Sequence, residues 1–202
     1  MTLHKSRTFL LILGALLLIA AEPADAASWN VIEDESRVEF SGNQMGVPTT
    51  GEFQSFTSEI DFDIAALTES TVSVVIDVTS VTAPYPVLAQ VLKQEPWFNV
   101  ADFPNATITI SNISKVEDDQ FNAAGTLTLR GITQPLDFAF SFTAFGPDPD
   151  RAGWSRAVMT GETTVQRTTF GVGQGEWGDT SIVADDVIIR VQLTAEQLTD
   201  QQ

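Results

Sequence analysis

Hydrophobic and polar residues alternate along most of the chain between positions 29 and 195. The alternation is clearest where Leu136, Phe138, Phe140 and Phe142 occupy every second position. Residues two apart in a strand lie on the same face of a sheet, so this pattern predicts strands with one apolar and one polar face. Such strands are typical of antiparallel sheets. The pattern recurs in eight segments, residues 38–40, 60–64, 72–78, 107–112, 121–129, 136–142, 157–165 and 187–193.

One segment departs from this alternation. Residues 86–93 place Val87, Leu88, Val91 and Leu92 at helical spacing, which predicts a short helix that ends before Pro96. Glycine, proline and acidic residues cluster between the predicted strands and mark turns. Eight antiparallel strands with one short helix predict an all-β fold that closes into a barrel, because closure removes exposed sheet edges. A two-sheet sandwich is the alternative.

The N-terminal residues 1–26 have the three parts of a secretory signal peptide. Two basic residues precede an apolar run at residues 9–21, which is shorter than the roughly 20 residues that span a bilayer. A small-x-small cleavage pattern follows at residues 24–26. We therefore expect a mature chain that begins at Ala27, forms a single domain over residues 27–202, lies in the periplasm and does not insert stably into the membrane.

Composition narrows the chemistry that the chain can perform. The formal net charge is −17, which argues against nucleic acid as a partner because phosphate binding needs a basic surface. Cysteine is absent, and the only histidine, His4, lies in the predicted signal peptide. We therefore expect no metal site and no cofactor. An Asp/Glu-dependent hydrolase remains an alternative, as does a ligand-free structural or stress-related β-domain.

The chain has 13 phenylalanines and one tyrosine, so its aromatic surface carries few polar groups. A phenylalanine-rich strand face is compatible with a plain hydrophobic core and with a hollow interior that holds an apolar ligand. Two arginines lie beside predicted turns, Arg130 before Gly131 and Arg167 before Phe170. Either could meet a ligand head group, but capping of backbone carbonyls or pairing with a carboxylate is the interpretation that we favour.

Several short motifs carry a resemblance to a known family, and they stand in the family's order. Residues 125–135 (GTLTLRGITQP) are similar to the G-x-L-T-x-R-G-x-T-x-P hairpin of the YceI family, the lipocalin-like polyisoprenoid-binding proteins of bacteria. Residues 167–171 (RTTFG) resemble its R-x-x-F-G corner. Three weaker marks agree, residues 51–53 (GEF), 80–81 (SV) and the pair 97–99 (WFN) with 103–104 (FP). The chain departs from the family at residues 43–45 (NQM), which stand just before Gly46 where the family often has a histidine, and at Asn99, where it often has an aspartate.

The resemblance implies an eight-stranded antiparallel lipocalin-like barrel with one short helix. It also implies a binding or carrier protein, with no catalytic residues, for a long-chain isoprenoid or acyl lipid: a polyisoprenoid, an isoprenoid quinone, or a fatty acid or amide. Whether two chains form a homodimer stays open. The residues that we expect to line the ligand site are Phe40, Phe53, Phe62, Ile76, Leu88, Trp97, Phe98, Ile110, Leu127, Phe138, Phe140, Phe142 and Phe170.

Overall fold

A computed structural model describes residues 28–199, so the predicted signal peptide and its cleavage site lie outside the described residues. Within these residues the chain forms a strand-rich fold with one α-helix, α1 (Pro86–Leu92), which confirms the predicted short helix. Four single 3-10 turns, η1 to η4, lie at Glu33–Glu35, Val78–Ser80, Arg167–Phe170 and Gly175–Gly178. The strands are β1 (Ser28–Val31), β2 (Arg37–Gln44), β3 (Val47–Phe53), β4 (Phe56–Asp61), β5 (Thr71–Asp77), β6 (Val81–Thr82), β7 (Asn105–Glu117), β8 (Gln120–Leu129), β9 (Ile132–Pro147), β10 (Trp154–Gln166) and β11 (Asp186–Leu198).

Eight of these strands close into an antiparallel ring in the order β1-β4-β5-β7-β8-β9-β10-β11. The ring closes because β1 pairs with β4 on one side, through Trp29 and Ile60, and with β11 on the other, through Asn30 and Glu196. The predicted eight-stranded barrel is therefore confirmed, and the two-sheet sandwich is excluded.

Strands β1 and β2 lie end to end along the same edge of β11. Strand β1 pairs with β11 at residues 195–196, whereas β2 pairs with residues 188–192, and the turn η1 separates the two strands. Strand β2 continues the sheet to β3, and β3 pairs with the two-residue strand β6. The wall of the barrel is thus built from different strands at its two ends.

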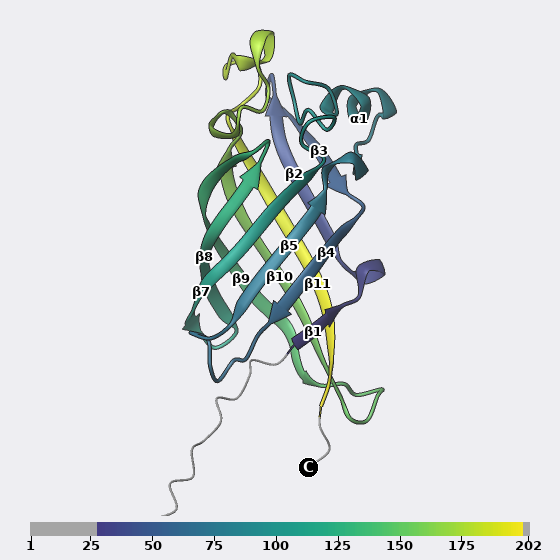
Figure 1. Cartoon of the computed structure of the whole chain (residues 1–202), viewed down its shortest axis with the longest axis vertical. Coiled ribbons are helices and arrows are strands. Elements are labelled where there is room, and N and C mark those ends of the chain that lie inside the picture. Colours follow the sequence, from purple (N-terminus) through teal and green to yellow (C-terminus); the bar gives the residue numbers. More distant parts are fainter. Residues whose placement is uncertain (1–27, 200–202) are drawn as a thin grey trace, which may run out of the picture.

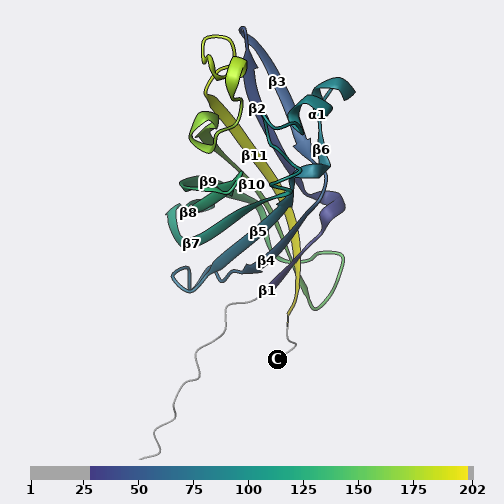
Figure 2. The same ribbon diagram turned by 45° about the horizontal axis from the view of Figure 1, so that its top comes forward.

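The two ends of the barrel also differ in what covers them (Figure 1). We call the end that carries α1, the turn between β2 and β3, and the loops of residues 167–184 the upper end, and the end that carries β1 the lower end. Figure 2 shows the same separation from a second direction, with α1 and the β2–β3 turn at one end and β1 at the other.

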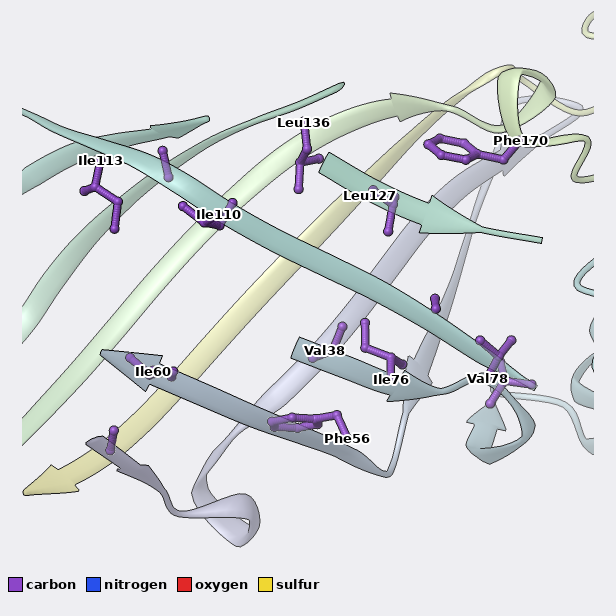
Figure 3. Close-up of a cluster of buried hydrophobic side chains, with 14 of the residues drawn as sticks. Val38, Phe56, Ile60, Ile76, Val78, Ile110, Ile113, Leu127, Leu136 and Phe170 are labelled. Carbon is purple, nitrogen blue, oxygen red and sulfur yellow. The ribbon is translucent and has the colours of Figure 1, made fainter. Parts of the chain in front are cut away.

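The hydrophobic core lies inside the ring. Side chains from β2, β5, β7, β8 and β9 point into the same interior: Val38, Ile76, Ile110, Leu127 and Leu136, all buried (Figure 3). The face that carries Leu136, Phe138, Phe140 and Phe142 points inward, as the alternation predicts, and packs with this core. Gly161 on β10 makes room for one of these rings, because a Cβ there would lie 2.5 Å from the ring of Phe138.

Each of the eight predicted strands has a counterpart, namely β2, β4, β5 and β7 to β11. The sequence pattern missed β1, β3 and β6. Strands β1 and β6 are too short to show a period, and β3 (VPTTGEF) contains a proline and a glycine and lacks alternation. The predicted strand at residues 60–64 ends earlier, since β4 ends at Asp61.

Candidate ligand cavity

The upper half of the barrel encloses an apolar cavity of about 180 Å³. We call it the upper cavity. Strands β2, β5, β7 and β8, the helix α1 and the loops of residues 167–184 all contribute to its lining. Three rings form a mutually packed cluster in its wall, with centroids 5.3–5.8 Å apart: Phe40, Phe53 and Phe98.

A second apolar cavity of about 130 Å³, which we call the lower cavity, occupies the lower half. A run of phenylalanines from β9 dominates its lining, together with Phe62 and Trp29. The rings of Phe121 and Phe140 stack at 5.2 Å, and Phe142 lies 5.4 Å from the rings of both Phe62 and Phe121. The lower cavity is therefore bounded by a connected aromatic cluster.

The two cavities adjoin, because Ile108 on β7 and Ile189 on β11 line both of them. All 13 residues expected at the ligand site line one cavity or the other. Eight border the upper cavity: Phe40, Phe53, Ile76, Leu88, Trp97, Phe98, Leu127 and Phe170. Five border the lower cavity: Phe62, Ile110, Phe138, Phe140 and Phe142. This placement makes them available to a ligand, while their binding role stays a prediction.

Sequence reasoning missed several lining residues. Ile108 and Ile189, at the junction, lie on predicted apolar strand faces, so the alternation alone could have found them. Trp177 also lines the upper cavity, from the glycine-rich segment between η3 and β11. A tryptophan in a glycine-rich segment indicates that the segment packs against the core, because a turn that is exposed to solvent seldom contains a large apolar side chain.

Arg167 is buried at the upper end and binds backbone carbonyls, the interpretation that we favoured from the sequence. Its guanidinium donates hydrogen bonds to the carbonyls of Val172, Gly173, Val183 and Ala184, at 2.7–3.1 Å. Burial lowers the pKa of Arg167, and the nearby Asp185 carboxylate opposes that shift. The arginine thereby joins the two loops that close the upper cavity on this side.

Arg130 plays a similar role from the β8–β9 turn, where Arg130 and Gly131 have the positive φ values, 51° and 72°, of a two-residue hairpin turn. Its side chain donates hydrogen bonds to the carbonyls of Glu95, at 2.6 Å, and of Trp97. The carbonyl between them, that of Pro96, accepts from the backbone N–H groups of Gly173 and Gln174. Residues 95–97 are therefore held firmly at the upper cavity.

Carboxylates contribute little to either cavity. Among the described residues, Glu39 is the one acidic residue that borders a cavity, and its side chain lies on the exposed side of β2. In the described part of the chain, no group of three or more His, Cys, Asp or Glu side chains is arranged to hold a metal ion. Among residues 28–199, no helix combines the length and the hydrophobicity needed to cross a bilayer.

A closed antiparallel barrel with adjoining apolar cavities along its interior defines a lipocalin-like architecture. Comparison with known proteins gives the family. The sequence model of the YceI-like domain matches residues 29–195, and the chain belongs to this family.

Relatives and solved structures agree with this assignment. The chain is 30% identical to a UPF0312 protein of Shewanella oneidensis, over 83% of this chain and 88% of that one. It is 31% identical to a UPF0312 protein of Azotobacter vinelandii, over 88% and 92%. The crystal structure of BcnA from Burkholderia cenocepacia superposes with a TM-score of 0.73 at 29% identity, covering 82% of this chain and 99% of BcnA. A polyisoprenoid binding domain from Saccharophagus degradans shares the fold, with a TM-score of 0.63 at 17% identity over 86% and 99%.

Proposed function

We propose that this protein binds a long apolar lipid inside the barrel and carries it in the periplasm, without catalysing a reaction. The ligand is an isoprenoid or acyl chain that runs through both cavities. The observation that carries the proposal is the junction at Ile108 and Ile189, where the upper and lower cavities adjoin. Two adjoining apolar spaces suit an extended chain better than a compact ligand.

The chemistry of the lining supports binding over catalysis. General acid–base catalysis needs a titratable group within hydrogen-bond reach of the reacting atoms. The lower cavity is lined by apolar side chains, with two hydrogen-bonding exceptions: the Trp29 indole N–H donates to the Phe62 carbonyl at 3.0 Å, and the Thr163 hydroxyl donates to the Asp137 carbonyl at 2.6 Å. The family adds further support, since a structural neighbour is described as a polyisoprenoid binding domain.

The energetics of such a ligand depend on fit. Burying a CH₂ group is worth roughly 0.8 kcal/mol, so a tail of about 15 carbons gains on the order of 12 kcal/mol before association costs of about 4–15 kcal/mol. Gain and cost are of similar size. We therefore expect the shape of the two cavities to select chain length, and carbon number alone to be a poor guide to affinity.

Location in the periplasm rests on the predicted signal peptide. N-terminal sequencing of periplasmic material is expected to begin at or near Ala27, and recovery of the intact leader in membranes would contradict export.

Extraction of the purified protein with organic solvent, followed by mass spectrometry, tests the carrier function directly. We expect a stoichiometric long-chain lipid in the extract, and saturable binding of the fluorescent probe 1-N-phenylnaphthylamine by the delipidated protein. An extract without lipid together with no probe binding would leave a ligand-free β-domain as the better account.

A further inference from the structure

The hairpin turn between β2 and β3 carries an apolar side chain in a backbone conformation that disfavours it. Gln44 pairs with Val47, so Met45 and Gly46 form a two-residue turn, and their φ values are 50° and 82°. Turns with positive φ at both central residues strongly prefer Asn-Gly or Asp-Gly. Met45 takes the place of the asparagine and is 77% exposed. Neither packing nor turn geometry therefore accounts for a methionine at this position.

The other non-glycine residues with positive φ within residues 28–199 have a local reason for it. Asn99 is of a type that adopts this conformation readily, and the side chain of Arg130 donates hydrogen bonds to backbone carbonyls. At Met45 it is the backbone that is held, because its N–H donates to the carbonyl of Ile182 at 2.8 Å. The methionine side chain extends into solvent from this fixed turn, and an unfavourable conformation of this kind points to a function outside the fold.

The β2–β3 turn, the start of α1 and the loop before β11 together bring five exposed apolar residues to the upper end. Both views show the turn and α1 at this end of the barrel (Figures 1 and 2). Three of the five, at 72–77%, are the most exposed large apolar residues in the described part of the chain. We call the five residues the apolar rim: Met45, Val47, Tyr85, Val87 and Ile182.

The apolar rim adjoins the upper cavity and is free of charge on two of its three segments. Residues 44–50 and 83–92 contain no Asp, Glu, Lys or Arg, although the chain has a net charge of −17. The same two segments line the upper cavity, for example through Thr49 and Leu88. The turns of the lower end are acidic by contrast, with residues 118–119 (DD) between β7 and β8 and residues 148–153 (DPDRAG) between β9 and β10.

A neutral lipid surface fits the apolar rim better than a second protein does. Stable protein interfaces use about 20–30 residues a side, whereas the rim has five side chains on protruding segments. Tyrosine is enriched where a protein meets the headgroup region of a bilayer. Asp179 and Asp185 flank the loop of Ile182, and with the net charge of −17 they repel anionic lipids. Zwitterionic lipids, which have no net charge, avoid this repulsion.

We propose that the apolar rim docks this protein reversibly on a zwitterionic lipid surface, with Met45 and Val87 as leading contacts, and so brings the upper cavity to the membrane. The inference rests on the proposed lipid-binding function and adds to it the surface at which lipid is taken up or delivered. The two are tested separately, because solvent extraction measures bound lipid and vesicle flotation measures docking. A protein that contains lipid but does not float with vesicles would contradict docking alone.

Flotation with vesicles of dioleoylphosphatidylcholine tests the docking surface. We expect the wild-type protein to float with these vesicles, and to float less at low salt when half of the lipid is replaced by the anionic dioleoylphosphatidylglycerol. Val87→Asp should lower the partition coefficient by about tenfold or more, because it removes one buried apolar side chain and adds a charge.

Val116→Asp is the matched control. It makes the same substitution at another exposed valine, 56% exposed on β7 near the lower end, and should leave the partition coefficient unchanged. Equal losses in Val87→Asp and Val116→Asp would show that added charge alone weakens vesicle binding, and would overturn the proposal. Failure of the wild type to float with phosphatidylcholine vesicles would overturn it as well.

Met45→Asn separates docking from folding. Asparagine suits the positive φ of this turn position, so the variant should unfold at the same temperature as the wild type or a few degrees higher. Its vesicle partition coefficient should fall about tenfold, since one large apolar side chain is lost from the contact. A lower unfolding temperature with unchanged vesicle binding would mean that Met45 serves the fold, and would contradict the proposal.

Sedimentation velocity distinguishes the membrane from a second copy of the chain. We expect Val87→Asp to leave the sedimentation coefficient of the protein unchanged in the absence of vesicles. A dimer of the wild type that Val87→Asp dissociates would assign the apolar rim to an interface between two copies, and the lipid-surface proposal would be wrong.

Discussion

The lower and upper halves of the barrel differ in the strands that form their walls and in the side chains that line their cavities. In the lower half the eight-stranded ring is complete, a connected phenylalanine cluster bounds the cavity, and the indole of Trp29 is satisfied. In the upper half β2, β3, β6 and α1 replace β1, loops joined by Arg167 close the wall, and the indole N–H of Trp97 is buried without an acceptor. The lower half is thus closed by paired strands, whereas the upper half is closed in part by loops and by α1.

The strongest test of this difference places a charge in the lower half. Phe140 stacks on Phe121 and has no cationic neighbour in the lower cavity, so Phe140→Asp would bury a carboxylate without a partner. We expect a loss of more than about 3–5 kcal/mol in unfolding free energy, or failure to fold, measured by chemical denaturation. Phe140→Ala should lose about 3 kcal/mol, since the ring is half-buried, and should alter chain-length preference.

Ser141→Asp is the control for this position, because Ser141 is the next residue on β9 and faces outward. Its stability and probe binding should stay near those of the wild type. If Ser141→Asp is damaging and Phe140→Asp is silent, the two faces of β9 have been assigned the wrong way round.

The next largest effect is expected at the upper end. Arg167→Met removes hydrogen bonds to buried carbonyls of the loops, and we expect a loss of about 3 kcal/mol, because each unsatisfied buried group costs about 1–3 kcal/mol and the loops relax in part. Hydrogen exchange should become faster across residues 171–184 and stay slow in β4 and β5. Uniform acceleration over the whole barrel would show that the two halves unfold as one unit.

A smaller effect, on ligand choice, should separate the cavities. Gly42 lines the upper cavity, and a Cβ there would meet only Val187, at 3.9 Å, so Gly42→Leu can project into open space. We expect Gly42→Leu to weaken the binding of lipids of every chain length, and Gly42→Ala, as the control, to weaken it only slightly.

Ala157→Leu in the lower cavity should instead shorten the longest lipid chain that the protein binds, at a stability cost of about 1–3 kcal/mol. Identical chain-length profiles in the two variants would argue against different roles of the two cavities in binding.

The smallest effect concerns the outer surface. Arg190 and Glu162 form an exposed ion pair at 3.2 Å between β11 and β10. Because exposed ion pairs contribute about 0–1 kcal/mol, Arg190→Ala should change stability by about 0.5 kcal/mol or less and leave ligand binding unaltered. A larger loss of unfolding free energy would mean that this ion pair on the outer face stabilises the barrel more than exposed ion pairs usually do.

Much of the fold was accessible from alternation because each long strand buries one face. Leu136, Phe138, Phe140 and Phe142 show the limit of that reasoning for the site. The pattern identifies them as inward, but whether an inward side chain borders empty space depends on the volumes of residues across the barrel, such as Gly161 and Ala157. Those partners are remote in sequence.

The polar contacts of the upper end were harder to predict from the sequence than the apolar lining of the cavities. The sequence left two interpretations open for Arg167, and the choice depends on where the carbonyls of residues 172–173 and 183–184 are brought by the loops. Likewise, the hydrogen bonds from Arg130 to the carbonyls of Glu95 and Trp97 depend on how the β8–β9 turn meets the segment after α1. These hydrogen bonds join segments that are distant in sequence, so the alternation of hydrophobic and polar residues does not reveal them.

The closure of the ring by β1 has a consequence for how the protein is made. Asn30 pairs with Glu196, so the first described strand and the last one must meet before the lower half has a complete wall. A nascent chain that lacks β11 leaves the edges of β1, β2 and β10 unpaired, and open edges of this kind invite aggregation. Contacts of such long sequence separation also fold slowly, in milliseconds to seconds for β-barrels. Biogenesis therefore favours a chain kept unfolded until synthesis is finished, which is the state in which a chain with a secretory signal peptide would be handed to an export channel.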